Sequence, residues 1–184
     1  DIATLAAHIK IPPLKTETVF FVLSWSNPYV NNHWQITHLG LTEEEIEFRR
    51  KQKWLNYYAT IFKNSKESAI YSLKNFDRLY QDTLLYKKAL FSSTLPAVVM
   101  DAISANAAVL KSPTCLRLSD GSFYAFEGVH AHMGSCEGTC THVWSYAYAL
   151  AFLFPRLERS ARTNEYTYSM QKDGGMGFRL QLPL

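Results

Sequence analysis

The segment from His142 to Arg162, HVWSYAYALAFLFPRLERSAR, most constrains what this chain can fold into. Its first half is apolar on nearly all sides, which is typical of a helix that other helices surround. Pro155 within it predicts either a kink or the first turn of a new helix. Because such a helix needs tertiary packing to be stable in water, the sequence predicts further helices around it.

Three other segments carry helix signals. Thr42 followed by Glu45 forms a capping-box pattern, and apolar residues continue at helical spacing as far as Phe62. The same periodicity predicts a second helix over about 66–91 and a third over about 94–111, which opens with a threonine cap and an early proline. These segments predict a mainly α fold.

The strand signals are fewer and shorter. Residues 16–25, TETVFFVLSW, are β-branched and aromatic, which predicts one buried strand whose partner comes from another chain or from other sequence. Residues 115–128 show a hairpin pattern around Asp120-Gly121, a dipeptide favoured in two-residue type I′ turns. Two alternating runs flank a turn within residues 165–184. The predicted fold class is therefore mainly α with β hairpins.

Composition narrows the classes of function. With 184 residues, of which 47% are apolar, the chain can bury the core of one domain of ordinary size. Its net charge of +3 is small and its basic residues are scattered, so we expect no nucleic-acid partner. No apolar run approaches the roughly 20 residues of a membrane span, and the first residues lack a signal-peptide pattern. Three cysteines, an odd number, favour a reducing compartment such as the cytoplasm.

A cluster of thiols and imidazoles follows the predicted hairpin, in FEGVHAHMGSCEGTCTHVW. Cys136, Cys140 and His142, with His130 or His132, are ligand types suited to zinc. Structural zinc sites, however, usually pair C-x2-4-C with a second ligand pair a dozen or more residues away, whereas these candidates are crowded on one loop. Buried cysteines and hydrogen-bonded loop histidines are the better interpretation, and zinc remains the alternative.

Two other thiol chemistries have less support. A disulfide between Cys136 and Cys140 would close a very small ring. Cys140 beside His142 could act as a nucleophile only with a positioned base, and the sequence does not show one.

The carboxylates offer a different chemistry. Glycoside hydrolysis needs two carboxyl groups that flank the scissile bond, commonly among aromatic side chains. Glu127 follows Phe123, Tyr124 and Phe126 at the end of the second predicted strand, so it has such a setting. Glu137 is a rival, although its glycine-flanked loop is a poor platform for a nucleophile. By themselves, the residues favour a solvent-exposed glutamate at the end of a strand over a catalytic role for Glu127.

The stretches FYAFEG, GSCEGTCTHVWSYAYALAFLFPRLERSAR and GFRLQLPL resemble the region that opens the catalytic domain of glycoside hydrolase family 116. This family includes bacterial β-glucosidases related to non-lysosomal glucosylceramidase. VFFVLSWSNP is similar to the last part of the family's N-terminal β-sandwich. LNYYATIFKNS and STLPAVVMDAISANAAVLKSPTCLRLSDGSFY are similar to its connecting helices and first toroid elements. The resemblance spans nearly the whole chain.

The resemblance implies a fold, a reaction and site residues. Residues 1–40 would end the β-sandwich, and residues 41–184 would hold the linker helices and the opening part of an (α/α)6 toroid. Glu127 matches the catalytic nucleophile of a retaining enzyme that uses no cofactor and no metal. Thr141 matches a position where eukaryotic members present an Asp that contacts the sugar, and His142 lies beside it.

The implied acid/base is an Asp in a motif well downstream of the matched region. We therefore expect the chain to work with the remainder of the same enzyme, on a β-glucoside or a glucosylceramide-like substrate, and to show no turnover when isolated. The alternative of another class is a non-catalytic carbohydrate-binding or interaction fragment. A Tyr-Asp-Gly-Trp-like stretch further along the coding sequence would distinguish the two.

Overall fold

The computed structural model describes residues 3–31, 42–111, 115–125, 128–129, 134–135, 139–140, 147–177 and 179–180. Within these ranges the chain is mainly helical with short antiparallel strand pairs, which confirms the predicted mixture of helices and hairpins. The helices are α1 (Glu43–Arg50), η1 (Tyr57–Thr60), α2 (Ser65–Lys74), α3 (Phe76–Phe91), α4 (Ala97–Ala108), η2 (Val109–Lys111), α5 (Ala147–Leu153) and α6 (Pro155–Tyr168). The strands are β1 (Tyr29–Asn31), β2 (Lys53–Leu55), β3 (Cys115–Arg117), β4 (Phe123–Ala125), β5 (Gly128–Val129), β6 (Gly134–Ser135), β7 (Thr139–Cys140) and β8 (Arg179–Leu180).

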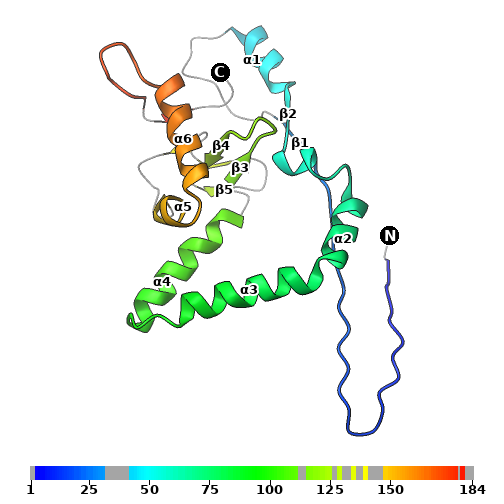
Figure 1. Ribbon diagram of the computed structural model, residues 1–184. Helices are drawn as coiled ribbons and strands as arrows, with labels where there is room; N and C mark the ends of the chain where they lie inside the picture. The colour runs from blue at the N-terminus through cyan, green and yellow to red at the C-terminus, as the bar shows by residue number, and fades with distance from the viewer. Residues whose placement is uncertain are drawn as a thin grey trace.

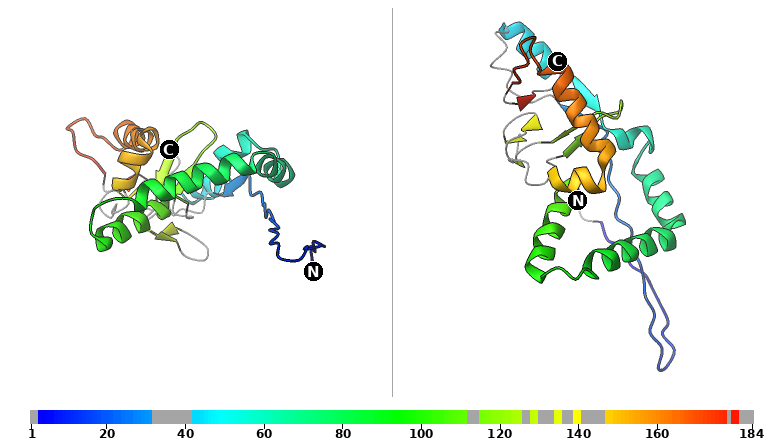
Figure 2. Two further views of the ribbon diagram at one scale, coloured as in Figure 1. Left: turned by 60° about the horizontal axis from the view of Figure 1, so that its bottom comes forward. Right: turned by 60° about the vertical axis from the view of Figure 1, so that its left-hand side comes forward.

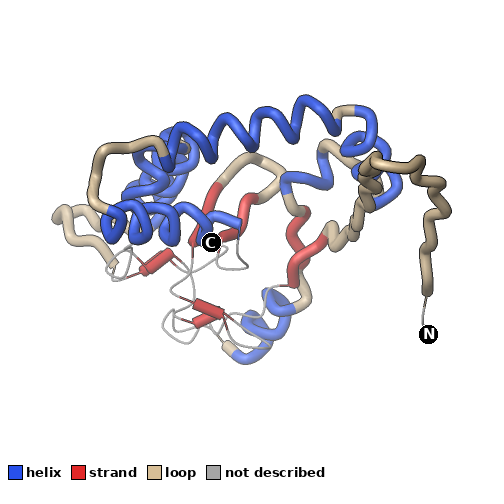
Figure 3. Tube along the Cα trace, turned by 90° about the horizontal axis from the view of Figure 1, so that it is seen from below, coloured by secondary structure: helices blue, strands red, loops and turns tan. Residues whose placement is uncertain are grey.

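The helices form an open arrangement around the small sheets. Helices α3 and α4 meet at an angle, and α5 and α6 lie beside the β3–β4 hairpin (Figure 1). The strands pair as β1–β2, β3–β4, β5–β6 and β7–β8, each antiparallel. Seen along another direction, the long α3 and the other helices border the strand pairs (Figure 3). The described core therefore centres on one hairpin.

The β3–β4 hairpin separates two apolar clusters. One cluster joins Leu116, Leu118 and Tyr124 to Leu180 of β8. The other joins Phe123 and Ala125 to Leu150 of α5 and Ala161 of α6. Successive side chains of a strand point to opposite faces. Tyr124 therefore packs in the first cluster, while its neighbours Phe123 and Ala125 pack in the second. The predicted hairpin is thus the central packing element of the described residues.

Helix α6 is fixed to this hairpin at two levels. Its Ala161 packs against β4, and the Ser160 hydroxyl accepts a 3.1 Å hydrogen bond from the Phe123 backbone N–H. Pro155 is in the first turn of α6, immediately after α5 ends at Leu153. The new-helix alternative at Pro155 is therefore confirmed, because proline's fixed φ suits a first turn.

The β1–β2 pair joins the other side of the hairpin. Asn56 bridges to Leu118, and the Ser119 N–H donates to the Leu55 carbonyl at 2.9 Å. Trp54 packs partly buried against the first cluster. The predicted domain boundary at residue 40 lies outside the described residues and stays a prediction.

Residues 16–25 form no strand within this chain, and the strand predicted there, with a partner from another chain or from other sequence, stays a prediction. The large apolar side chains of this segment are exposed, with Trp25 70% exposed. The outer part of residues 3–28 extends away from the rest of the molecule (Figures 1 and 2). The part nearer β1 is in contact with it, because the rings of Phe20 and Phe76 of α3 lie 4.4 Å apart and the Asn27 N–H donates to the Tyr58 hydroxyl at 2.6 Å. A strand needs a neighbour for its backbone hydrogen bonds, and within the described ranges none pairs with this segment.

The helix that begins after Thr42 is shorter than predicted. The capping box is present, because the Thr42 side chain accepts from the Glu45 N–H and the Glu45 carboxylate accepts from the Thr42 N–H. The helix nevertheless ends at Arg50, and β2 and η1 follow where a continuing helix was expected. Pairing with β1 outweighs the local periodicity there, since tertiary contacts override weak propensities.

The next two helices agree better with prediction. The segment expected as one helix over 66–91 is divided at Asn75 into α2 and α3. The Tyr71 carbonyl accepts from both the backbone N–H of Asn75, at 3.0 Å, and the side-chain amide of Asn75, at 2.9 Å, where α2 ends. Helix α4 and η2 end at Lys111, as predicted.

The C-terminal prediction is half right. Its first alternating run belongs to the end of α6, whereas the predicted turn is present between Met170 and Met176, which form a bridge. Strand β8 pairs with β7 rather than with the first run. The first run is too short for its pattern to distinguish a helix from a strand. The packing of α6 on β4 favours the helix there.

The turn of the β3–β4 hairpin differs from the predicted type I′. The Gly121 N–H donates to the Leu118 carbonyl at 2.8 Å, and the Leu118 N–H donates to Ser122 at 2.9 Å. Gly121 has φ +90°, but Asp120 is not among the described residues with positive φ, which a type I′ turn would require. The loop is therefore a three-residue turn with a glycine bulge.

Replacing Gly121 should destabilise the hairpin through its backbone alone. A Cβ at Gly121 would meet no atom within 4 Å, so a Gly121→Ala change adds no clash. An L-residue at this φ costs about 1–2 kcal/mol, and we expect that loss of unfolding free energy in chemical denaturation. Ser119→Ala, at an exposed position of the same turn, is the control and should change the unfolding free energy little. Equal stability of Gly121→Ala and the unmodified protein would contradict the bulge geometry.

Candidate functional site

The residues predicted for the sugar site lie outside the described residues. These are Glu127, Thr141 and His142, together with the rival Glu137. Their assigned roles stay predictions. The strands on either side of them are described, and these strands show which parts of the chain converge.

Strand β4 ends at Ala125, two positions before Glu127, and strand β7 ends at Cys140, directly before Thr141. Strands β4 and β7 are in contact with each other. Strand β7 also pairs with β8, in the register Thr139 to Leu180 and Cys140 to Arg179. The segments that lead into both predicted parts of the site therefore run from neighbouring strands.

The zinc alternative stays a prediction. Cys136, His142 and the other two candidate histidines lie outside the described residues, and Cys140 is described only as part of strand β7. Among the residues that are described, no group of three His, Cys, Asp or Glu side chains is placed to hold a metal ion. Cys115 of β3 is half-buried and packs on the cluster of Phe123 and Ala161, whereas the interpretation of Cys136 and Cys140 as buried thiols stays a prediction.

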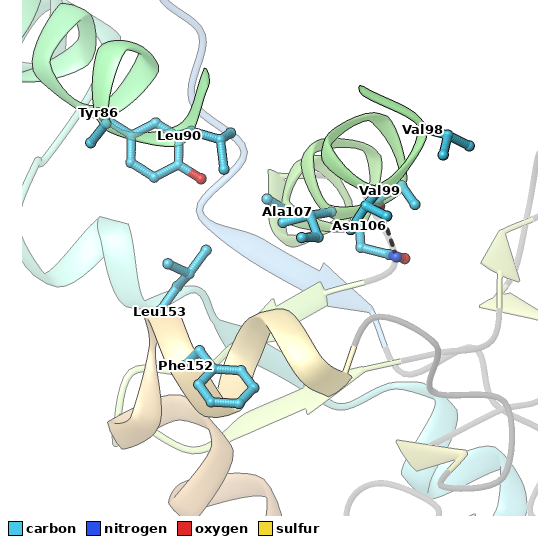
Figure 4. A pocket seen from close by; sticks show the side chains of 11 residues that line it. Tyr86, Leu90, Val98, Val99, Asn106, Ala107, Phe152 and Leu153 are labelled. Atoms are coloured by element: carbon cyan, nitrogen blue, oxygen red, sulfur yellow. Dashed lines mark hydrogen bonds between the residues drawn. The ribbon is translucent and has the colours of Figure 1, made fainter. Parts of the chain in front are cut away.

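An apolar groove of about 820 Å³ lies between α3, α4 and α5 (Figure 4). Tyr86 and Leu90 face it from α3, Val99 from α4 and Leu153 from α5. Asn106, its one amide, donates to the Ala102 carbonyl at 3.0 Å. The described residues that line the groove include no carboxylate, histidine or cysteine, so they supply no group for acid–base or nucleophilic chemistry.

A smaller, polar pocket of about 230 Å³ lies between α6 and the β7–β8 pair. Arg162 of α6 donates from Nε to Glu158 at 2.7 Å and from Nη1 to Glu165 at 2.6 Å. Glu165 is only 4% exposed, and Thr139 of β7 is fully buried. The sequence analysis missed this cluster, although the spacing of these three side chains along one helix face could have indicated it.

Burial controls the ionisation of Glu165. It raises the pKa of this carboxyl, and the nearby Glu158 adds to the effect, while Arg162 opposes it by Coulomb attraction and hydrogen bonding. The raised pKa means that the folded protein holds the proton of Glu165 more tightly than the unfolded chain does.

The raised pKa predicts a pH-dependent difference between the wild type and Glu165→Gln. Because the folded pKa lies above the unfolded value of 4.5, the stabilising contribution is complete below pH 4.5 and is lost as pH rises through the folded pKa. The wild type should therefore lose unfolding free energy relative to Glu165→Gln as pH rises above 4.5, measured by denaturation at each pH. Thr139→Val, which changes no charge, should differ from the wild type by a constant amount. A wild type that gains unfolding free energy relative to Glu165→Gln as pH rises would contradict the direction of the shift.

Comparison with known proteins assigns no family. A scan against protein-family models and a search of curated proteins each returned no match. Of the helices within the described residues, none is both long and apolar enough for a membrane span.

Proposed function

We propose that the chain is part of a retaining glycoside hydrolase of family 116, with Glu127 as nucleophile and a β-glucoside or glucosylceramide-like substrate. The first support is the resemblance of FYAFEG and of GSCEGTCTHVWSYAYALAFLFPRLERSAR to the opening of that family's catalytic domain. The mainly helical structure with hairpins is compatible with this fold.

The single observation that carries the proposal is the contact between β4 and β7. Glu127 follows the end of β4 by two positions, and Thr141 follows the end of β7 directly. Consecutive Cα atoms lie about 3.8 Å apart, so each residue is within about 8 Å of its strand end. Two segments with roles in one sugar site therefore begin from strands that touch.

The proposed reaction has two steps. The Glu127 carboxylate attacks the anomeric carbon, the glycosidic bond breaks, and the leaving oxygen takes a proton from an Asp supplied by the remainder of the enzyme. Water, deprotonated by the same Asp, then attacks the anomeric carbon and releases Glu127. Thr141 and His142 would hydrogen-bond sugar hydroxyls, since hydroxyl and imidazole groups can both donate and accept. The product keeps the β configuration.

The apolar groove between α3, α4 and α5 supports the toroid part of the proposal. Several of the apolar side chains that line it are exposed to solvent, and Phe152 of α5 is 82% exposed. In an (α/α)6 toroid each helix packs between others, so further helices would cover this groove. Likewise, the exposed residues 16–25 would become a strand of the β-sandwich once a neighbouring strand is present.

Trapping of the covalent intermediate tests the proposal directly. The protein that contains this chain should hydrolyse an aryl β-glucoside with retention, followed by NMR of the first-formed product. A 2-deoxy-2-fluoro-β-glucoside with a good leaving group should accumulate a glycosyl-enzyme, and peptide mass spectrometry should place the label on Glu127. Inverted product or a label on another carboxylate would overturn the assignment, and an absence of both hydrolysis and label would favour the non-catalytic alternative.

A further inference from the structure

The polar pocket between α6 and the β7–β8 pair has the features of a binding site that the proposed reaction does not use. Its volume is about 230 Å³, below the range of roughly 300–1,000 Å³ typical of drug-sized ligands. The pocket is lined by Thr139, Arg162, Glu165, Tyr166, Ser169, Met176, Gly177 and Leu180. The proposed reaction assigns roles to Glu127, Thr141 and His142, which lie outside the described residues, and gives no role to these lining residues.

Two buried oxygen atoms in this pocket lack partners among the described residues. One is Oε1 of Glu165, whose other oxygen binds Arg162 at 2.6 Å. The other is the hydroxyl oxygen of Thr139, a residue with no exposed surface. Buried polar atoms are nearly always hydrogen-bonded in native proteins, so these two atoms indicate a missing partner of complementary chemistry.

The ion pair between Arg162 and Glu165 limits the charge that a bound ligand can carry. Arg162 holds the Glu165 carboxylate by one oxygen, which leaves Oε1 as an acceptor in a fixed direction. Two carboxylates and one guanidinium give the Glu158–Arg162–Glu165 cluster a net charge of −1 when all three are ionised, which disfavours an anion. The adjacent guanidinium disfavours a divalent cation. A neutral donor of hydrogen bonds fits best.

The remaining wall favours a ring that carries hydroxyl groups. Tyr166 and Ser169 add two hydroxyls, which can both donate and accept. Met176 and Leu180 form an apolar side against which the C–H face of a sugar or cyclitol could pack. We propose that this pocket binds a neutral polyhydroxylated ring of monosaccharide size, with one ligand hydroxyl donating to Glu165 and another bonded to Thr139.

Calorimetric titration of the purified protein with glucose, xylose and myo-inositol tests this inference. At least one of these rings should bind, and Glu165→Ala and Thr139→Val should each weaken its binding about tenfold or more, as expected for lost hydrogen bonds. Glu17→Gln, a change to an exposed glutamate of the N-terminal segment, should bind as the wild type does. Thermal unfolding of each variant shows whether it is folded, and Glu165→Gln replaces Glu165→Ala if the latter does not fold.

The same titration on Glu127→Gln separates this inference from the proposed hydrolase. Retained binding in Glu127→Gln, with loss in the two pocket variants, supports the pocket whether or not the protein hydrolyses a glucoside. Loss of binding in Glu127→Gln with full binding in both pocket variants would place the ligand elsewhere and overturn the inference. Failure of all three rings to bind the wild type, or tighter binding of methylammonium than of any ring, would also overturn it.

Discussion

Replacing Glu127 with Gln should abolish hydrolysis of an aryl β-glucoside by the protein that contains this chain. The amide has the size of the carboxylate but cannot form the covalent glycosyl-enzyme on which a retaining reaction depends. Loss of a group that carries out the chemical step typically lowers kcat by roughly 10⁴-fold or more. Initial rates with an activated aryl β-glucoside measure the effect.

Two further variants sharpen this experiment. Glu137→Gln is the matched control, because it makes the same change at the rival carboxylate and should leave the rate near normal. In Glu127→Ala, added azide should restore part of the rate and yield the α-glycosyl azide, since azide attacks from the face that Glu127 would have used. A near-normal rate in Glu127→Gln, with loss in Glu137→Gln, would transfer the nucleophile to Glu137.

Replacing Leu150 with Ala should give the largest loss of stability among the described residues. Leu150 has 0% exposed surface and packs with Phe123, Ala125 and Ala161 where α5, α6 and the hairpin meet. Leu-to-Ala changes at such positions cost about 2–5 kcal/mol, because they remove buried methyl groups and leave a cavity. Denaturant unfolding should show this loss as a lower midpoint.

Leu5→Ala is the control for Leu150→Ala, because the side chain of Leu5 is 77% exposed. We expect a change of no more than about 0.5 kcal/mol there, as for most surface substitutions. Equal effects of the two variants would show that Leu150 is not a core residue.

Local chemistry made several elements predictable. The capping box of Thr42 and Glu45 depends on groups three residues apart, and Pro155 fits the first turn of a helix because of its own ring. The β3–β4 hairpin was predictable because its strands are close in sequence, although the bulge at Gly121 was not. In each case a few neighbouring residues contain the signal.

Long-range pairing made other elements unpredictable. The residues of β2 follow a helical period, yet they pair with β1, whose residues lie more than twenty positions earlier. The polar pocket needs Thr139 of β7 beside Glu165 of α6, and no local pattern joins them. For the candidate site itself, the residues gave Glu127 as one candidate carboxylate with an aromatic setting. Its role as nucleophile and the position of Thr141 came from the resemblance.

The sequence by itself determined the capped start of α1 after Thr42, the start of α6 at Pro155, which hairpin forms between β3 and β4, and which carboxylate is the best candidate nucleophile. These features depend on backbone preferences and side-chain capping over a few residues. Only the tertiary structure decided that β4 touches β7, that residues 16–25 are unpaired in this chain and that Glu165 is buried beside Arg162. Those outcomes depend on contacts between segments that are far apart in the sequence. Hydrophobic packing across the whole chain decides which of these segments meet and exclude water.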